Sequence, residues 1–209
     1  MTWQSLAIVP AAGRSVRMGQ AKLLMPWGGA TLIEHVLGAW RGSRVTATVI
    51  VLHPDDHELA AICRSAGVEV VVAESPPPDM KASITLGLRH FEHTRRPSAG
   101  DVWLVAPGDL PLLESRTIDA LLAMHNPAKP TILAPIDPAG KRSHPVLFPW
   151  SLAAAVRELP ADQGLKHLLD QHAVREVSVP WLVPSADVDT PEDYRRLRNR
   201  YDRDDRPAN

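Results

Sequence analysis

The fold of this chain is decided by the stretch Ala7-Ile8-Val9-Pro10-Ala11-Ala12-Gly13-Arg14-Ser15-Val16-Arg17-Met18-Gly19-Gln20-Ala21-Lys22. Residues 6–9 are a short apolar run of the kind that forms a buried strand, and the small residues and glycines after them predict a loop. Small residues let backbone N–H groups approach a ligand closely, and such loops form concavities that bind anions. Three cations in this loop, Arg14, Arg17 and Lys22, favour a polyphosphate ligand. Spacing alone also allows a solvated basic turn between a strand and a helix.

The loop has neither of the two common phosphate-binding patterns, because Gly19 precedes Gln20 and Gly13 precedes Arg14. It resembles instead the signature loop of the nucleotidyltransferases of the molybdenum-cofactor type, Leu-Ala-(Ala or Gly)-Gly-x-Ser-x-Arg-Met-Gly and then Lys. Pro10 stands in the Leu place, and the matching residues are Ala11, Ala12, Gly13, Ser15, Arg17, Met18, Gly19 and Lys22. The resemblance implies that these residues and Arg14 bind a nucleoside triphosphate (NTP), with Arg17 and Lys22 in catalytic roles on its phosphates.

Length and composition predict one globular domain. The chain has 209 residues, and we expect a single nucleotidyltransferase domain over residues 1–201 and a charged tail that frays over residues 202–209. The net charge of −1 provides no overall field for nucleic acid or a membrane surface, so neither is an expected partner. Cys63 is the only cysteine, and the start of the chain lacks the features of a signal peptide, which together favour a cytoplasmic protein.

Strands and helices alternate along the sequence. Apolar, β-branched runs predict strands at residues 6–9, 45–52, 68–72, 102–106, 131–135, 145–148 and 174–179, and the run at 145–148 is short enough for an edge or antiparallel strand. Apolar faces of helical period predict helices at 31–40, 55–66, 80–91, 115–125, 151–159, 164–172 and 191–201. The alternation predicts an α/β, three-layer architecture with a mostly parallel sheet, helices on both faces and a less regular second half. The family resemblance implies that this is the Rossmann-like nucleotidyltransferase fold, with the second half on the acceptor side. Ligands of such sheets bind beyond the carboxyl ends of the strands.

Asp109 follows a predicted strand and a Pro-Gly turn. One interpretation is a Mg²⁺ ligand, since Mg²⁺ takes one or two carboxylates together with substrate phosphates. The other is an aspartate that caps its own turn. The segment resembles the Gly-Asp-x-Pro of the same family, which implies that Asp109 is both a metal ligand and a catalytic residue.

The stretch Asp187-Val188-Asp189-Thr190-Pro191-Glu192-Asp193 contains two acids at i and i+2, which point the same way in an extended segment. A carboxylate before a helix is also favoured by the helix dipole, so simple capping is the alternative. The stretch resembles the family's Asp-x-Asp-Thr-Pro-Glu-Asp motif, which implies that Asp189 is the second metal ligand and that Asp187 lies on the acceptor side.

Two further stretches match the family with departures. Met80 and Ser83 lie in a segment that resembles its nucleotide-contacting Gly-Met-x-x-Ser, although Asp79 replaces the glycine and Lys81 adds a cation. Ser83 is alternatively a plain residue near a helix start. The remaining matches imply that His144 and Asp162 contact the acceptor: His144-Pro145-Val146-Leu147-Phe148 follows Ser143 in place of a glycine, and Asp162-Gln163-Gly164-Leu165-Lys166 has Lys for the family's Arg. His144 is alternatively structural.

The resemblance implies a Mg²⁺-dependent transfer of a nucleoside monophosphate to a phosphorylated acceptor, here a molybdopterin-type molecule, with a molybdoenzyme as a further partner. In the family, Ala-Ala-Gly accompanies cytidylyl transfer and Ala-Gly-Gly guanylyl transfer, so Ala12 favours CTP over GTP. Three alternatives stay open. The methylerythritol-phosphate cytidylyltransferases share the opening loop, but their His-Asp-Ala-Ala-Arg-Pro stretch is absent here. The others are a sugar-phosphate nucleotidyltransferase and, from another class, a non-catalytic carrier of the molybdenum cofactor.

Overall fold

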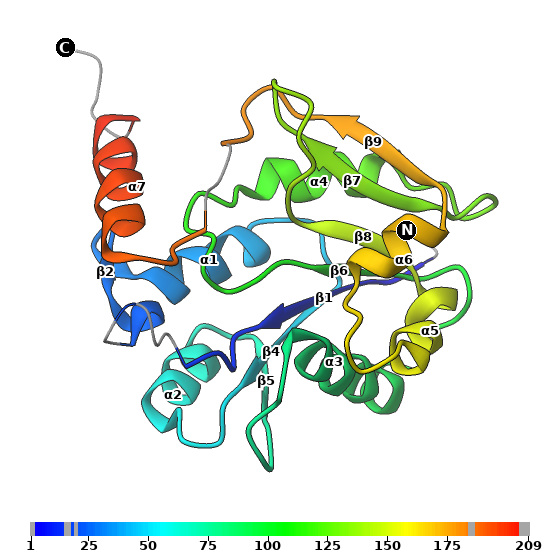
Figure 1. Ribbon diagram of the computed structural model, residues 1–209, viewed down its shortest axis with the longest axis horizontal. Coiled ribbons are helices and arrows are strands. Elements are labelled where there is room, and N and C mark those ends of the chain that lie inside the picture. The colour runs from blue at the N-terminus through cyan, green and yellow to red at the C-terminus, as the bar shows by residue number, and fades with distance from the viewer. Residues whose placement is uncertain (1–2, 15–17, 19–20, 184–186, 205–209) are drawn as a thin grey trace.

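The computed structural model describes residues 3–14, 18, 21–183 and 187–204. Seven strands form one sheet in the order β5-β4-β1-β6-β8-β7-β9 (Figure 1). Their bounds are β1 (Ser5–Pro10), β4 (Ala47–Leu52), β5 (Glu69–Val72), β6 (Val102–Val105), β7 (Ile132–Ile136), β8 (Val146–Pro149) and β9 (Val174–Ser178). Neighbouring strands are parallel except at β8, which pairs antiparallel with both β6 and β7. The predicted mostly parallel sheet is confirmed.

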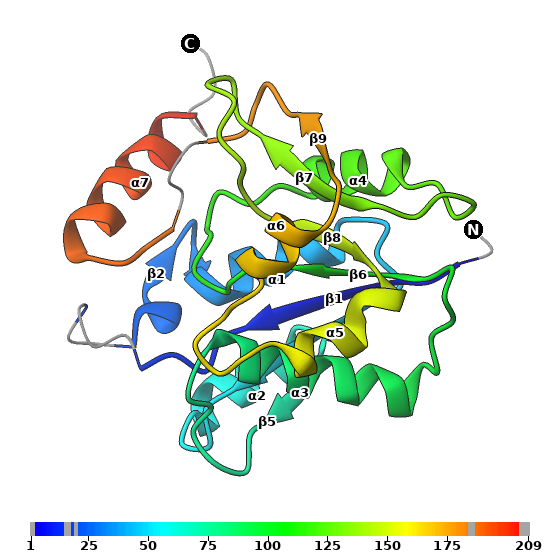
Figure 2. The same ribbon diagram turned by 45° about the vertical axis from the view of Figure 1, so that its right-hand side comes forward.

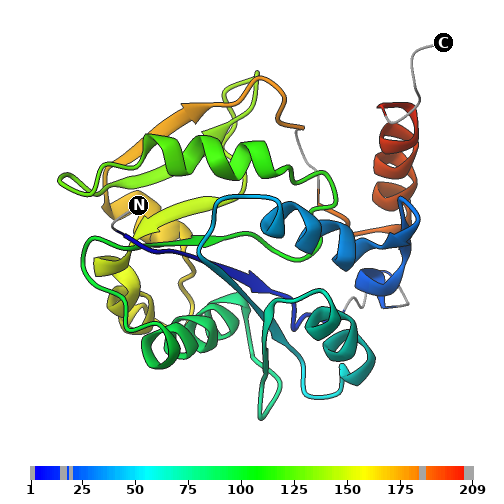
Figure 3. The same cartoon turned by 180° about the vertical axis from the view of Figure 1, so that it is seen from behind.

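Helices cover both faces of this sheet and bury two separate apolar cores. The first core joins the sheet to α1 (Leu32–Arg41), α2 (His57–Ser65) and α4 (Ser115–Met124). The second joins it to α3 (Met80–Thr94), α5 (Ala153–Glu158) and α6 (Lys166–Gln171). Figure 2 shows α3, α5 and α6 in front of the strands, and Figure 3 shows α1 and α4 from the opposite side. The three-layer α/β architecture is therefore as predicted.

The start of α1 shows how local sequence sets an element boundary. The Thr31 hydroxyl accepts a hydrogen bond from the Glu34 amide at 3.4 Å, and a Glu34 carboxylate oxygen accepts one from the Thr31 amide at 2.8 Å. This is a capping box, which satisfies two otherwise unpaired N–H groups at once. The hydrogen bond from the Thr31 hydroxyl, and to a smaller extent that from the Thr31 amide, holds the pKa of Glu34 below its ordinary value.

Three features differ from the sequence predictions. The strand predicted at 145–148 is antiparallel but does not lie at an edge, because β8 is enclosed between β6 and β7. A short hairpin of β2 (Pro26–Trp27) and β3 (Ala30–Thr31) follows a single 3₁₀ turn at Lys22–Leu24 and was not predicted; a second such turn, Trp150–Leu152, leads into α5. The last helix, α7 (Pro191–Asp204), continues past the predicted end at Tyr201.

The helix α7 packs on this hairpin through aromatic rings, at the side of the molecule seen next to β2 in Figure 1. The ring of Trp27, which is fully buried, lies 5.9 Å from the ring of Tyr194 and 5.5 Å from that of Tyr201. The Tyr194 hydroxyl donates to the carbonyl of Pro26, and the Arg198 guanidinium donates to the same oxygen at 2.9 Å. These contacts fix the helix that follows the Asp187–Asp189 segment.

None of the helices in the described part of the chain combines the length and the apolar character that crossing a bilayer requires.

Candidate functional site

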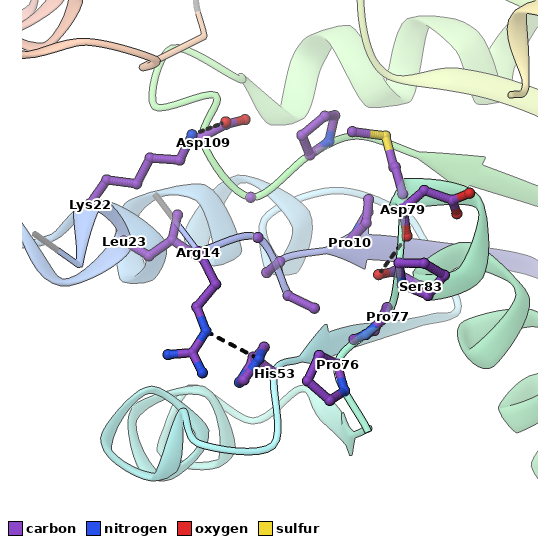
Figure 4. Close-up of a pocket in the computed structure, with 17 residues that line it drawn as sticks. Pro10, Arg14, Lys22, Leu23, His53, Pro76, Pro77, Asp79, Ser83 and Asp109 are labelled. Atoms are coloured by element: carbon purple, nitrogen blue, oxygen red, sulfur yellow. Dashed lines mark hydrogen bonds and ion pairs between the residues drawn. The ribbon is translucent and has the colours of Figure 1, made fainter. Parts of the chain in front are cut away.

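A cavity of about 530 Å³ opens at the carboxyl ends of β1 and β6. The first loop, residues 10–14, forms one wall, and the turn at residues 107–109 forms another. The remaining walls are formed by Lys22, Leu23 and His53 and by the segment from Pro76 to Met80 together with Ser83 (Figure 4). Its place agrees with the rule that open parallel sheets bind ligands beyond the strand ends.

The first loop presents unpaired backbone N–H groups to this cavity. The Ala11 amide donates to the Val51 carbonyl at 2.9 Å, which continues the pairing of β1 with β4. Among the described residues, the amides of Ala12 and Gly13 have no hydrogen-bond partner. Backbone amides left unpaired at a cavity wall suit an anion, because their N–H groups are available to donate to it.

The residue before Asp109, Gly108, lies close against the first loop. Its amide donates to the Pro10 carbonyl at 3.2 Å, so the turn and the first loop are in direct contact. A Cβ atom at Gly108 would lie 3.3 Å from Ala11 Cβ and 3.3 Å from Ile33 Cδ1. A side chain here would therefore push Asp109 away from the first loop.

Lys22 and Asp109 meet at one side of the cavity (Figure 4). Lys22 Nζ lies 2.5 Å from Asp109 Oδ2, 2.9 Å from the Val188 carbonyl oxygen and 3.7 Å from Asp189 Oδ1. The side chains of Lys22 and Asp109 are 15% and 17% exposed, so this ion pair is largely shielded from water. The structure thus brings Asp109 and Asp189, both predicted metal ligands, to the same ammonium group.

The oxygen atoms around Lys22 fit a hard divalent cation. Asp109 Oδ1 is buried and makes no hydrogen bond within the described part of the chain. Two carboxylates and a carbonyl are donors that Mg²⁺ accepts, with water and substrate phosphates completing its coordination. No group of three or more His, Cys, Asp or Glu side chains in described positions could hold a metal, so a cation here depends on these two aspartates. The residues present fit the expected ion.

Arg14 lines the cavity, and its guanidinium points toward His53, which lines the cavity too (Figure 4). Arg14 Nε donates to His53 Nε2 at 3.1 Å, and a terminal nitrogen of Arg14 pairs with Asp55 Oδ2 at 2.5 Å. The His53 side chain is buried, while those of Arg14 and Asp55 are both more than half exposed. The guanidinium therefore braces the first loop against the loop after β4.

Ser15, Arg17 and Gly19, which the sequence also predicts at the nucleotide, lie outside the described residues. Met18 is buried in the core next to them.

The start of α3 supplies Met80 and Ser83 to the cavity wall, as the sequence predicts. Asp79, where the family has glycine, caps α3 by accepting a hydrogen bond from the Ala82 amide at 2.7 Å. Lys81 turns away from the cavity and donates to the Pro160 carbonyl at 2.6 Å, with the carbonyls of Leu159 and Ala161 at 3.4 Å. The two departures from the family pattern thus have structural roles: one starts the helix and the other holds the loop between α5 and α6.

The predicted acceptor residues are placed less closely together. His144 is partly buried, and its pKa is lowered because burial disfavours the charged ring, with Val105 and the charges of Asp109 and Asp187 acting in the opposite direction. His144 Nδ1 is buried and makes no hydrogen bond to any described residue. Asp187 is exposed. Asp162 is exposed, lies in the loop between α5 and α6 that Lys81 holds, and does not line the cavity.

Sequence reasoning missed several residues that form the site. His53 and the prolines Pro76, Pro77 and Pro78 line the cavity, and the Val188 carbonyl contacts Lys22. The place of the proline run between β5 and α3 puts it at the carboxyl edge of the sheet, which is the signal that could have found it. A backbone carbonyl such as that of Val188 carries no signal in its residue type.

Comparison with known families gives one match over most of the chain. A family model described as "MobA-like NTP transferase domain" matches residues 7–177. Among curated proteins, the "Bifunctional protein GlmU" of Leifsonia xyli subsp. xyli is 36% identical over 132 residues, which are 60% of this chain and 26% of that protein. The "3-deoxy-manno-octulosonate cytidylyltransferase" of Chlorobaculum parvum is 32% identical over 116 residues, 56% of this chain and 43% of that protein. The chain therefore matches about a quarter to under half of the length of these relatives.

Comparison with solved structures extends over nearly the whole chain. The crystal structure of Rv0371c from Mycobacterium tuberculosis H37Rv aligns with a TM-score of 0.76 at 28% identity and covers 95% of this chain and 100% of that one. The same mycobacterial protein has also been solved as a complex with manganese, with a TM-score of 0.73 at 28% identity, covering 94% of this chain and 98% of that one.

Proposed function

Because this chain belongs to the MobA-like NTP transferase domain family, we propose that it transfers a nucleoside monophosphate, preferably CMP, from an NTP to a phosphorylated acceptor. The acceptor that we propose is molybdopterin, and pyrophosphate is the second product. The cluster of Lys22, Asp109 and Asp189 beside the unpaired amides of the first loop is the observation that carries the proposal. We treat residues 1–201 as one functional unit, because the segment before α7 contributes Asp189.

The proposed mechanism assigns the phosphates to the first loop. The amides of Ala12 and Gly13, with Lys22 and with Arg17 of the signature, hold the triphosphate, and Met80 and Ser83 border the nucleoside. A divalent cation held by Asp109 and Asp189, Mg²⁺ by preference, would neutralise the phosphate charge and orient the reacting groups. An oxygen of the acceptor phosphate attacks the α-phosphorus in line, the bond to the bridging oxygen breaks, and pyrophosphate leaves. A phosphate nucleophile is already ionised near neutral pH, so positioning and charge neutralisation suffice without a strong base.

The acceptor assignment relies on His144, Asp162 and Asp187. Burial lowers the pKa of His144, so its ring is neutral near pH 7, and its unpaired Nδ1 can exchange a hydrogen bond with a polar acceptor. The manganese complex of the mycobacterial relative supports a divalent cation in this family. The cytidylyltransferase among the curated relatives supports CTP as the donor. Ala12, whose methyl group lies in the cavity wall, is the residue to which we attribute the preference for a pyrimidine.

A sugar phosphate is the second candidate acceptor, because the opening loop from Pro10 to Gly13 also resembles that of the sugar-phosphate nucleotidyltransferases. The two candidates share the nucleotide half of the site and differ only in the acceptor half.

Pyrophosphate release from each of the four NTPs, measured with Mg²⁺ and with or without molybdopterin, tests the proposed function. The expected result is release with CTP that depends on molybdopterin and falls by about 100-fold or more in Asp109→Ala, because a lost charge-stabilising group costs roughly that factor. Asp119→Asn is the matched control, since Asp119 pairs with Arg44 and does not line the cavity.

Each other outcome redirects the proposal. Release with GTP would retain the mechanism and remove the explanation based on Ala12, as would an unchanged CTP preference in Ala12→Gly. Release that depends on a sugar phosphate would replace the acceptor. Tight molybdopterin binding without release from any NTP, unchanged in Asp109→Ala, would favour a non-catalytic carrier.

A further inference from the structure

The first loop has a single polar anchor at the point where its amides face the cavity. The Ala11 amide still belongs to the sheet through its bond to the Val51 carbonyl. Within the described part of the chain, the backbone of residues 12–14 makes no hydrogen bond, and the side chain of Arg14 makes the only polar contacts of this stretch. The position of the two amides that face the cavity therefore depends on where the Arg14 side chain is held.

Two acceptors from the loop between β4 and α2 hold the guanidinium of Arg14. Its Nε donates to His53 Nε2 at 3.1 Å, and a terminal nitrogen donates to Asp55 Oδ2 at 2.5 Å. Two acceptors on a planar fork fix the orientation of the group as well as its position, which a lone exposed ion pair does not do. The His53 side chain is only 4% exposed, so this acceptor is itself fixed by its surroundings. We call the arrangement of Arg14, His53 and Asp55 the Arg14 clamp.

The clamp directs the charge of Arg14 toward an acid instead of leaving it for a ligand. The acid that follows in the sequence, Asp56, offers a comparison. Asp55 and Asp56 both line a second cavity next to the first loop. Asp56 precedes α2 without a side-chain hydrogen bond to the helix, and no described contact joins it to Arg14. Two neighbouring acids thus carry the same charge near the same loop, and Asp55 alone of the two belongs to the clamp.

From these contacts we infer that His53 and Asp55 are positioning residues for triphosphate binding, which act through Arg14 to keep the unpaired amides of the first loop directed into the cavity. In this role Arg14 supplies a planar fork and not a phosphate-binding charge. Asp55 then strengthens the binding of an anion, although it is an acid itself. The inference deepens the proposed function and rests on it, because it takes the triphosphate of an NTP as the ligand of the first loop.

The direction of the effect at Asp55 separates the clamp from direct binding by Arg14. If Arg14 bound the phosphates itself, Asp55→Ala would free its charge, remove a repulsive carboxylate and tighten triphosphate binding. In the clamp, the same substitution releases the loop. A loop that is correctly placed for about one tenth of the time binds its ligand about tenfold more weakly. We therefore expect Asp55→Ala to raise the Kd of inorganic tripolyphosphate about tenfold, as measured by isothermal titration calorimetry on the full chain with excess Mg²⁺.

Asp56→Ala is the matched control, because it removes the same charge from the next residue and leaves the clamp in place. Its Kd for tripolyphosphate should be equal to that of the wild type or slightly lower. Arg14→Lys keeps the positive charge but loses the planar fork, so it should weaken binding about as much as Arg14→Met. Asp55→Ala placed in the Arg14→Met background should add little further loss, because both substitutions remove the same contact.

The side chains of Arg14 and Asp55 are both more than half exposed, so the variants are expected to fold, which circular dichroism checks. Tripolyphosphate binding in Asp55→Ala that is unchanged or tighter would overturn the inference, and so would Arg14→Lys that binds as well as the wild type. Pyrophosphate release from the NTPs, measured on the same proteins, separates the two proposals. Weakened binding in Asp55→Ala, in a chain that releases no pyrophosphate, would retain the clamp and remove the proposed function. Release by a chain whose Asp55→Ala and Asp56→Ala variants bind equally would retain the function and overturn the clamp.

Discussion

The backbone amide of Val188 donates to the backbone carbonyl of Asp109 at 3.0 Å. This bond joins the turn after β6 to the segment before α7, so Asp109 and Asp189 keep a fixed relation that does not depend on their side chains. Lys22 spans the same two segments from the other side. The way in which α7 packs on the β2–β3 hairpin therefore bears on the geometry around Lys22.

Replacement of Gly28 tests this packing. Gly28 has φ +54°, and a Cβ atom there would lie 2.6 Å from the hydroxyl of Tyr201 on α7. Gly29→Ala is the matched control, because Gly29 has φ +82° and an added Cβ would meet nothing within 4 Å. Each alanine costs about 1 kcal/mol for the left-handed backbone, and the clash at Gly28 adds about 1–3 kcal/mol. Urea unfolding should show Gly28→Ala to be the less stable, and equal free energies of unfolding would contradict the described packing of α7.

Two helical glycines predict opposite changes in stability. A Cβ atom at Gly87 in α3 would lie 2.7 Å from Ile8 Cγ2 on β1, whereas one at Gly38 on the exposed side of α1 would meet nothing within 4 Å. Gly38→Ala should stabilise by up to about 1 kcal/mol through helix propensity. Gly87→Ala gains the same propensity but forces α3 away from the sheet, and we expect a net loss of about 1–3 kcal/mol. Thermal unfolding of both variants checks the pair, and stabilisation by Gly87→Ala would show that α3 sits farther from β1 than described.

The hydrogen bonds of Lys81 to the loop between α5 and α6 predict a local effect. In Lys81→Met the carbonyls of Leu159, Pro160 and Ala161 lose their donor, while the α3 cap by Asp79 stays. Amide hydrogen exchange over residues 159–165 should become faster, with α3 unchanged. Lys166→Met, an exposed lysine after the same loop, serves as the control and should leave exchange unaltered. If amide exchange over residues 159–165 is the same in both variants as in the wild type, Lys81 does not hold the loop.

Glu69 predicts a pH dependence of stability. Burial raises the pKa of the Glu69 carboxyl, but hydrogen bonds from Arg95 and His90 outweigh it and hold that pKa below its ordinary value. A carboxyl whose pKa is lower when folded contributes stability above its unfolded pKa, near 4.3, and loses it as the pH falls through the folded pKa. Glu69→Gln should therefore destabilise by about 1 kcal/mol at pH 7, and the difference from the wild type should shrink below about pH 4.

Glu176→Gln provides the comparison for Glu69. Its partner Arg142 lies at 2.8 Å, but both side chains are more than 40% exposed, so water screens the pair and little change is expected. A difference between Glu69→Gln and the wild type that persists unchanged to pH 3 would exclude the assigned role of the carboxylate.

Elements with their own local signals could be predicted from the sequence. Thr31 and Glu34 predict the start of α1, because both partners of the capping box lie within one helical turn. Gly67, at φ +75°, closes the turn after α2, and a glycine directly after an apolar helical pattern is likewise a local signal. The hairpin at 26–31 also had a signal, since Gly28 and Gly29 separate its strands, but two-residue strands are too short for an alternating pattern.

Features that depend on distant partners could not be predicted in the same way. The apolar run that becomes β8 suits an edge or an interior strand equally, and only its pairing with both β6 and β7 decides the matter. In the candidate site, Lys22 and Asp109 were each singled out, but their mutual contact needs the fold to bring them together. Arg14 was expected to contact a nucleotide, and its partners in the structure, His53 and Asp55, are supplied by another loop that the sequence pattern does not connect with it.

β8 runs antiparallel to β6 and β7. The carboxyl edge of the sheet therefore carries the residues that follow the parallel strands and also the residues that precede β8. Val146 pairs with Val105, so the residues entering β8, His144 among them, arrive at the same rim as Asp109. In the described part of this half, the connection from β7 to β8 leads from one strand directly to the next and does not precede a helix. Its turn at Pro138–Gly140 offers a place where loops of varied length can be grafted to search for new acceptors while the nucleotide half is left as it is.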